Sequence, residues 1–131
     1  MKRVITFGTY DLLHIGHINI FKRARALGDS LIVGISTDDL NYSKKQIYPI
    51  YSQQDRAEIV KSLRFVDEVF FEESLELKRE YIQKYTADVL VMGDDWKGKF
   101  DFCNDLCEVV YLERTPEIST TELKQNIKDR H

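Results

Sequence analysis

The sequence predicts an α/β protein with a Rossmann-like, doubly wound sheet of five parallel strands and helices on both faces. Five short apolar runs alternate with segments whose apolar residues keep helical spacing, a pattern typical of parallel strands joined by right-handed helical crossovers. The 131 residues are 43% hydrophobic and 31% charged, which suits one hydrophobic core. We therefore expect a single domain over residues 1–131.

The first half of the chain predicts two strands and a long loop. Residues 1–7 contain a β-prone apolar run, and apolar residues at helical spacing follow until Gly28, which favours a helix stop. Residues 30–36 form a continuous apolar run, as expected of a strand buried on both faces. Polar residues 37–51 include a proline and predict a loop, and loops of this length are usually functional.

The middle of the chain continues the alternation. The pattern Ser52–Asp55 resembles a capping box and predicts a helix behind it. Further strands are expected over 66–71 and 88–92, with a helix over 74–85 between them. Residues 94–105 predict a loop, or a loop with a short helix.

The last segment predicts a fifth strand over 108–112, a second capping box at 119–122 and a closing helix through Ile127. The turns that follow strands one, four and five should meet at one rim, because open parallel sheets bind ligands beyond the carboxyl ends of their strands.

Composition excludes some function classes. The net charge is −3, so there is no general basic field for nucleic acid or an anionic membrane surface, and we expect neither partner. The chain enters a strand without a leader pattern, which predicts a cytoplasmic protein. Cys103 and Cys107 lack neighbouring zinc ligands and are expected to be reduced thiols.

The segment from Gly8 to His17 predicts a phosphate site. It places Gly8, His14, Gly16 and His17 between a strand and a helix start, where free backbone N–H groups and the helix dipole favour anions. A zinc site that also uses Asp11 is the rival interpretation, although its histidine spacing is poorer than that of known helical zinc ligands.

Arg114 and the Thr115–Thr121 segment form a second candidate phosphate site on the same rim. A guanidinium, hydroxyls and the free N–H groups of a helix start converge there. Lys44 and Lys45, in the predicted loop, are placed to close over phosphates. Asp94, after the fourth strand, is either a capping residue or a reader of the nucleotide base.

Together these motifs resemble the nucleotidyltransferases that carry an H-x-G-H motif and a terminal I-S-T-T-type motif. The resemblance runs from Met1 to about Lys128 and includes the segment Met92–Phe102. It is greatest to cytidylyltransferases that act on glycerol 3-phosphate. The family implies that CTP and sn-glycerol 3-phosphate give CDP-glycerol and pyrophosphate with Mg²⁺. It also implies a homodimer and a role in supplying precursors of cell-surface polymers such as teichoic acid or capsule.

The resemblance also implies residue roles. Catalytic roles are expected for His14, His17, Lys44, Lys45 and Arg114. Nucleotide binding is expected of His14, His17 and Arg114 as well, and of Gly8, Thr9, Tyr10, Gly16, Asp94, Thr115, Ile118, Ser119, Thr120 and Thr121. Asp11 is expected to orient the motif, and Lys44, Arg64 and Lys78 to hold the acceptor phosphate. The metal ligands are not indicated.

The chain departs from the family pattern near the acceptor residues. Gln46 follows the lysine pair, Leu75 replaces a usual tryptophan, and Glu117 replaces a usual glycine. These departures leave another small phosphorylated alcohol open as the acceptor. ATP as the donor and a nucleotide-binding module without catalysis are two further alternatives.

Overall fold

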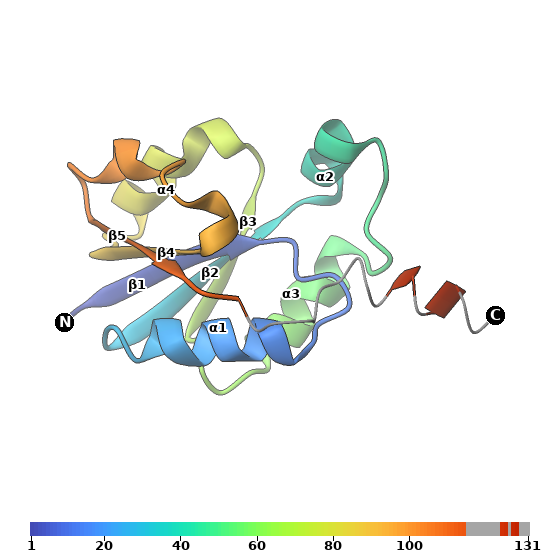
Figure 1. Cartoon of the computed structure of the whole chain (residues 1–131), viewed down its shortest axis with the longest axis horizontal. Helices are drawn as coiled ribbons and strands as arrows, with labels where there is room; N and C mark the ends of the chain where they lie inside the picture. Colours follow the sequence, from blue (N-terminus) through green and yellow to red (C-terminus); the bar gives the residue numbers. More distant parts are fainter. Residues whose placement is uncertain (115–123, 126, 129–131) are drawn as a thin grey trace.

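The computed structural model describes residues 1–114, 124–125 and 127–128, and its centre is a parallel sheet (Figure 1). The five strands are β1 (Arg3–Gly8), β2 (Ser30–Ser36), β3 (Glu68–Glu72), β4 (Val89–Gly93) and β5 (Glu108–Leu112). Their spatial order is β3-β2-β1-β4-β5, and every pairing is parallel. The chain thus winds outward from β1 in both directions, which confirms the predicted doubly wound fold.

Helices cover both faces of the sheet (Figure 1). They are α1 (Ile15–Arg25), α2 (Asp38–Lys45), α3 (Gln53–Lys61) and α4 (Lys78–Lys84), with single 3₁₀ turns η1 (Leu75–Leu77), η2 (Asp94–Trp96) and η3 (Asp101–Cys103). Phe21 of α1 and Val60 of α3 join the core on one face, whereas Ile82 of α4 and Cys103 of η3 join it on the other.

The two core clusters follow the alternation of side chains along the strands. Val4 of β1 packs with the α1 and α3 layer, and the next residue, Ile5, packs with the α4 layer. Both side chains are fully buried. Because β1 and β4 are central and covered on both faces, they hold the turns that follow them in fixed positions.

The prediction of a long loop over residues 37–51 was wrong for its first half. Residues Asp38–Lys45 form α2, and the Thr37 side chain accepts the N–H of Leu40 as its N-cap. Acidic residues occupy the first turn of α2 and Lys44 and Lys45 the last, which complements the helix dipole. Gln46 ends α2 with a left-handed φ of 59°. The loop is therefore shorter and begins at Gln46.

Other boundaries differ by smaller amounts. The expected helix over 74–85 is divided into η1 and α4, and the segment 94–105 contains the two turns η2 and η3. The second capping box, Ser119–Glu122, lies outside the described residues. Within the part of the chain that the structure describes, no helix has the length and apolar character needed to span a bilayer.

Candidate active site

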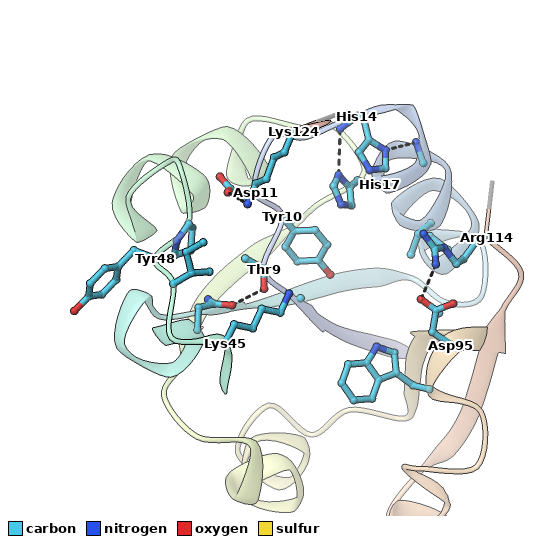
Figure 2. Close-up of a pocket in the computed structure, with 18 residues that line it drawn as sticks. Thr9, Tyr10, Asp11, His14, His17, Lys45, Tyr48, Asp95, Arg114 and Lys124 are labelled. Carbon is cyan, nitrogen blue, oxygen red and sulfur yellow. Dashed lines mark hydrogen bonds and ion pairs between the residues drawn. The ribbon is translucent and has the colours of Figure 1, made fainter. Parts of the chain in front are cut away.

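A cleft of about 440 Å³ opens at the carboxyl ends of β1 and β4 (Figure 2), a volume typical of small-molecule sites. The turn after β1, the first turn of α1, the α2 helix, the turn after β4 and Arg114 all contribute to its lining. The expectation that the turns after strands one, four and five share a rim is therefore confirmed for their described residues. Of the residues predicted for the site, the cleft gathers Gly8, Thr9, Tyr10, Asp11, His14, Gly16, His17, Lys45 and Arg114.

The floor of the cleft is the tight turn after β1. Tyr10 and Leu12 adopt left-handed backbone conformations, with φ of 56° and 50°, which are strained for such residues. The Tyr10 ring folds back over Gly8, where a Cβ atom would lie 2.7 Å from the ring. The ring also packs against Phe21 and against the edge of His17. Glycine at position 8 is required by this close approach.

His14 and His17 cap helix α1 with their own rings. The Nδ1 atom of His14 accepts the N–H of Gly16 at 3.0 Å, and the Nδ1 atom of His17 accepts the N–H of His14 at 3.1 Å. This is a capping box in which histidines take both side-chain roles. Because each Nδ1 accepts a hydrogen bond, each neutral ring carries its proton on Nε2. Both residues line the cleft and offer it an Nε2–H donor.

Both histidines are held in the neutral form. Burial, followed by the charge of His14, lowers the pKa of His17 to about 4. Burial, followed by the nearby Arg114 guanidinium, lowers the pKa of His14 as well. The rings stack with centroids 3.9 Å apart, so protonating both would place like charges in contact. At neutral pH the pair therefore acts as two hydrogen-bond donors without net charge.

Asp11 ties the histidine turn to the segment before α3. Its carboxylate accepts the N–H groups of Ile50 at 2.7 Å and Tyr51 at 2.9 Å, and it pairs with Lys124 at 3.2 Å. Although burial opposes them, these bonds hold the pKa of Asp11 below its usual value. The carboxylate is thus engaged with the protein, as an orienting residue requires.

Arg56 fixes the same region from inside the fold. Its fully buried guanidinium donates to the carbonyl oxygens of Thr9, Ser36 and Tyr51 and pairs with Asp38 at 2.7 Å. One side chain therefore holds the ends of β1 and β2 together. The partners of Arg56 come from distant segments, so the spacing of residues within α3 does not reveal this position.

Arg114 reaches the cleft from the end of β5 and pairs with Asp95 at 3.0 Å (Figure 2). Both side chains are about half exposed, so the pair can exchange with an anionic ligand at little cost. The sequence did not indicate Asp95 or Lys124 as parts of the cleft, although both line it.

Residues 5–126 match a family model described as cytidylyltransferase-like. The chain belongs to the cytidylyltransferase-like family. It is 54% identical over 128 residues to glycerol-3-phosphate cytidylyltransferase of Bacillus subtilis, covering 97% of this chain and 98% of that protein. It is 52% identical over 128 residues to the protein of that name in Staphylococcus aureus, covering 97% and 96%.

The chain is also similar to more distant proteins. FAD synthase of Pyrococcus abyssi is 41% identical over 93 residues, covering 71% of this chain and 63% of that protein. A crystal structure of the lipopolysaccharide core biosynthesis protein from Thermoplasma volcanium superposes with a TM-score of 0.74 at 23% identity. That match covers 88% of this chain and 97% of the other and shows the fold alone.

In this cytidylyltransferase-like chain, the adjacent residues Lys44 and Lys45 at the end of α2 have different surroundings. Lys45 lines the cleft, whereas Lys44 does not. Lys44 lies within electrostatic reach of Glu72 and Lys78. Burial lowers the pKa of Lys44, and the charge of Lys45 adds to this effect while Glu72 opposes it. The structure thereby separates two lysines that the sequence could not distinguish.

Lys78 is buried in the fold and does not line the cleft. It is 1% exposed, forms an ion pair with Glu72, and holds its Nζ atom 3.9 Å from the centroid of the Phe7 ring and 5.2 Å from that of Phe100. Burial lowers the pKa of Lys78, an effect that Glu72 opposes. The Glu72–Lys78 pair with Lys44 forms a second cationic group, which we call the Lys44–Lys78 cluster.

Three other predictions fare differently. Arg64 lies between α3 and the start of β3, at the end of the sheet opposite the cleft, and its guanidinium lies over the Phe65 ring. A contact between Arg64 and a ligand in the cleft is therefore not supported within one chain. Asp94 is exposed and does not line the cleft. The predicted nucleotide-binding residues Thr115, Ile118, Ser119, Thr120 and Thr121 lie outside the described residues.

The side chains of the cytidylyltransferase-like site do not resemble a zinc centre. Among the described residues, no group of three or more histidines, cysteines or carboxylates is placed to hold a metal. Both histidines use Nδ1 for capping, and Asp11 is bonded to two amides and a lysine. Cys103 and Cys107 are free and buried. The cleft is organised for an anion.

Proposed function

We propose that this protein is a glycerol-3-phosphate cytidylyltransferase that makes CDP-glycerol and pyrophosphate from CTP and sn-glycerol 3-phosphate. The observation that carries the proposal is the pair of neutral histidines at the start of α1, in a chain 54% identical to a relative of that name. A phosphate oxygen of the acceptor attacks the α-phosphorus of CTP. A new P–O bond forms as the bond to the β-phosphate breaks, and pyrophosphate leaves.

The histidine turn stabilises charge on the CTP phosphates. The Nε2–H groups of His14 and His17 donate to phosphate oxygens, and the start of α1 adds the positive end of its dipole. Lys45 and Arg114 supply full positive charges from two other walls of the cleft. Fixed donors aimed at developing charge are usually the largest catalytic contribution, and each is worth about 10²–10³ in rate.

The acceptor phosphate is assigned to the Lys44–Lys78 cluster. Lys44 supplies a cation there, whereas Lys78 is buried and paired with Glu72, so Lys78 would contact the acceptor phosphate only by exchanging that carboxylate for it. The acceptor needs no general base, because the second pKa of a phosphomonoester is about 6 and its oxygen is already ionised at neutral pH. The site must therefore chiefly bring two polyanions together against their repulsion.

Magnesium fits the site as a partner of the triphosphate. Mg²⁺ commonly takes one or two carboxylates and completes its shell with phosphate oxygens and water. Of the described cleft residues only Asp11 and Asp95 carry carboxylates, and each already has a cationic partner. The ion would neutralise charge on the phosphates, held mainly by CTP itself.

The proposal also includes roles for residues that do not line the described cleft, and a cellular role and oligomeric state. Thr115, Ile118, Ser119, Thr120 and Thr121 are assigned to the phosphates, and Asp94 to the base, on the family resemblance. The protein is proposed to act in the cytoplasm as a homodimer that supplies precursors for cell-surface polymers such as teichoic acid or capsule. Sedimentation of the purified chain tests the dimer, and a purely monomeric species at micromolar concentration contradicts it.

The function is tested by measuring pyrophosphate release from each of the four nucleoside triphosphates with Mg²⁺ and a panel of acceptors. The panel holds glycerol 3-phosphate, other phosphorylated alcohols and phosphocholine. Turnover should be fastest with CTP and glycerol 3-phosphate and should be lost in His14→Ala. Faster turnover with ATP or with another acceptor contradicts the assigned substrates. CTP binding without release from any pair identifies a non-catalytic module.

A further inference from the structure

Asn41 has a buried polar side chain that lies between the turn after β1 and helix α2, which also carries Lys45. It is 2% exposed and lies in α2, yet it also contributes to the cleft lining. Its side-chain oxygen accepts from the Thr9 hydroxyl at 2.9 Å. Its nitrogen donates to the Ser36 hydroxyl at 2.8 Å and to the Thr37 carbonyl at 2.9 Å. Asn41 therefore joins the ends of β1 and β2 to α2.

The orientation of this amide follows from its partners. Backbone carbonyls only accept, and the Asn41 nitrogen faces those of Thr37 and Ser36. The oxygen must then face Thr9, so the Thr9 hydroxyl donates its proton to Asn41. The Ser36 hydroxyl, 3.1 Å from that of Thr9, accepts from Asn41 and keeps its own proton for Thr9 or the Gly8 carbonyl. The Thr9 proton is thus directed into the protein.

Asn41 and Lys45 are four residues apart on α2 and lie on one face of it. Both line the cleft, whereas Lys44 does not. The first turn of α2 is held by the Asp38–Arg56 ion pair and by hydrogen bonds between Asp38 and Gln53, whereas Leu40 and Asn41 are the only residues of α2 that are buried. Asn41 lies one helical turn before Lys45, so its hydrogen bonds hold the turn of α2 that precedes the cleft lysine.

We propose that Asn41 is a positioning residue that sets Lys45 against the nucleotide phosphates by anchoring α2 to Thr9 and Ser36. The inference rests on the proposed function, because it takes a nucleoside triphosphate as the cleft ligand. It also gives the Thr9 side chain a structural role, in which the hydroxyl holds Asn41 and does not contact the ligand.

The proposal is tested by double-mutant cycles on ligand affinity, measured by calorimetry with the full chain. Asn41→Ala should weaken CTP binding by about tenfold, as expected when a buried hydrogen-bonded group is lost. In the Lys45→Met background the same change should have little further effect, because the group being positioned is already gone. In the Arg114→Met background it should weaken binding by the full factor, since Arg114 comes from another segment.

A second cycle keeps the test informative if Asn41→Ala does not fold. Thr9→Val preserves the shape of the side chain and removes only the hydroxyl that Asn41 accepts from. It should weaken CTP binding to a similar extent and should also be non-additive with Lys45→Met. Additive losses with Lys45→Met in the variants that fold would overturn the positioning role. So would a lower melting temperature with unchanged CTP affinity.

Inorganic tripolyphosphate is titrated in parallel to separate the two proposals. If the wild-type protein binds tripolyphosphate but not CTP, the proposed function fails, and the cycles are then evaluated on tripolyphosphate. If the wild-type protein binds CTP and turns it over, but the losses of affinity in the double variants are additive, the proposed function stands and the positioning role of Asn41 fails.

Discussion

His14 and His17 stack with ring centroids 3.9 Å apart, and the Nδ1 atom of His17 accepts the backbone N–H of His14. The same two rings therefore accept backbone N–H groups at the N-terminus of α1 and supply hydrogen-bond donors to the cleft. Folding and catalysis depend on different nitrogens of each ring, so substitutions can separate the two contributions.

His17→Ala removes both the capping acceptor and the donor to the cleft, whereas His17→Gln removes mainly the donor. Glutamine at this third helical position can still accept the N–H of His14, as in an ordinary capping box. Alanine should reduce the free energy of unfolding by about 1 kcal/mol, whereas glutamine should leave it nearly unchanged. Alanine should also lower kcat by about 10²–10³, the loss expected for one donor to developing charge. Urea unfolding and steady-state kinetics measure the two effects. Full activity in His17→Ala would show that the ring has no catalytic role.

The lowered pKa values of the histidines predict a pH dependence of stability. The folded-state pKa of His17, about 4, lies below its ordinary value of 6.5. As pH falls below 6.5, the unfolded chain binds a proton before the folded chain does. The stability contributed by the neutral ring is therefore complete above pH 6.5 and is lost between pH 6.5 and 4.

His17→Gln isolates this contribution, because nearby carboxylates also titrate at the lower end of the range. The melting temperature of the variant should fall less than that of the wild-type protein between pH 7 and 4.5. Parallel decreases in the two proteins would mean that His17 titrates near its ordinary pKa.

The fold and the floor of the cleft could be predicted because their signals are local. Continuous apolar runs identify buried parallel strands, and the carboxyl ends of such strands share an edge. The glycines and histidines after β1 therefore located the cleft without further information. The helix α2 was missed because only Leu40 and Asn41 on it are buried, so it has little apolar periodicity. Thr37 with two following aspartates was the signal that could have revealed it.

The partners of buried charges could not be predicted. Arg56 and Lys78 both occur on helices with exposed charged neighbours, and their burial depends on Asp38 and Glu72, which come from other segments. No spacing in the sequence records such pairs. Arg64 was assigned to the site by resemblance, but within one chain its side chain does not lie near the cleft. A resemblance in sequence therefore does not by itself place a side chain at a site.

Lys44 and Lys45 should affect different substrates. Lys45→Met should raise the KM for CTP by about tenfold, because a cation facing the phosphates is lost. Lys44→Met should raise the KM for glycerol 3-phosphate and leave that for CTP nearly unchanged. Each variant is the control for the other, since both remove one charge from the last turn of α2. Steady-state kinetics with one substrate varied and the other saturating distinguish them. An equal effect of both variants on CTP would contradict the assignment of Lys44 to the acceptor.

Arg56→Met should destabilise the protein more than any substitution of a surface arginine. It leaves Asp38 without its partner and the carbonyls of Thr9 and Ser36 without their donor. Removing one member of a fully buried ion pair costs about 3–5 kcal/mol, and because the Asp38 side chain is 29% exposed, the loss here should lie near or below the lower end of that range. Arg56→Lys should recover little, because an ammonium group cannot reach the same set of oxygens as the planar guanidinium.

The matched control is Arg79→Met, which breaks the exposed pair with Asp105 and should cost much less. Urea unfolding at constant m-value measures all three variants. A loss for Arg56→Met no larger than that for Arg79→Met would mean that the ends of β1 and β2 are held together without the guanidinium.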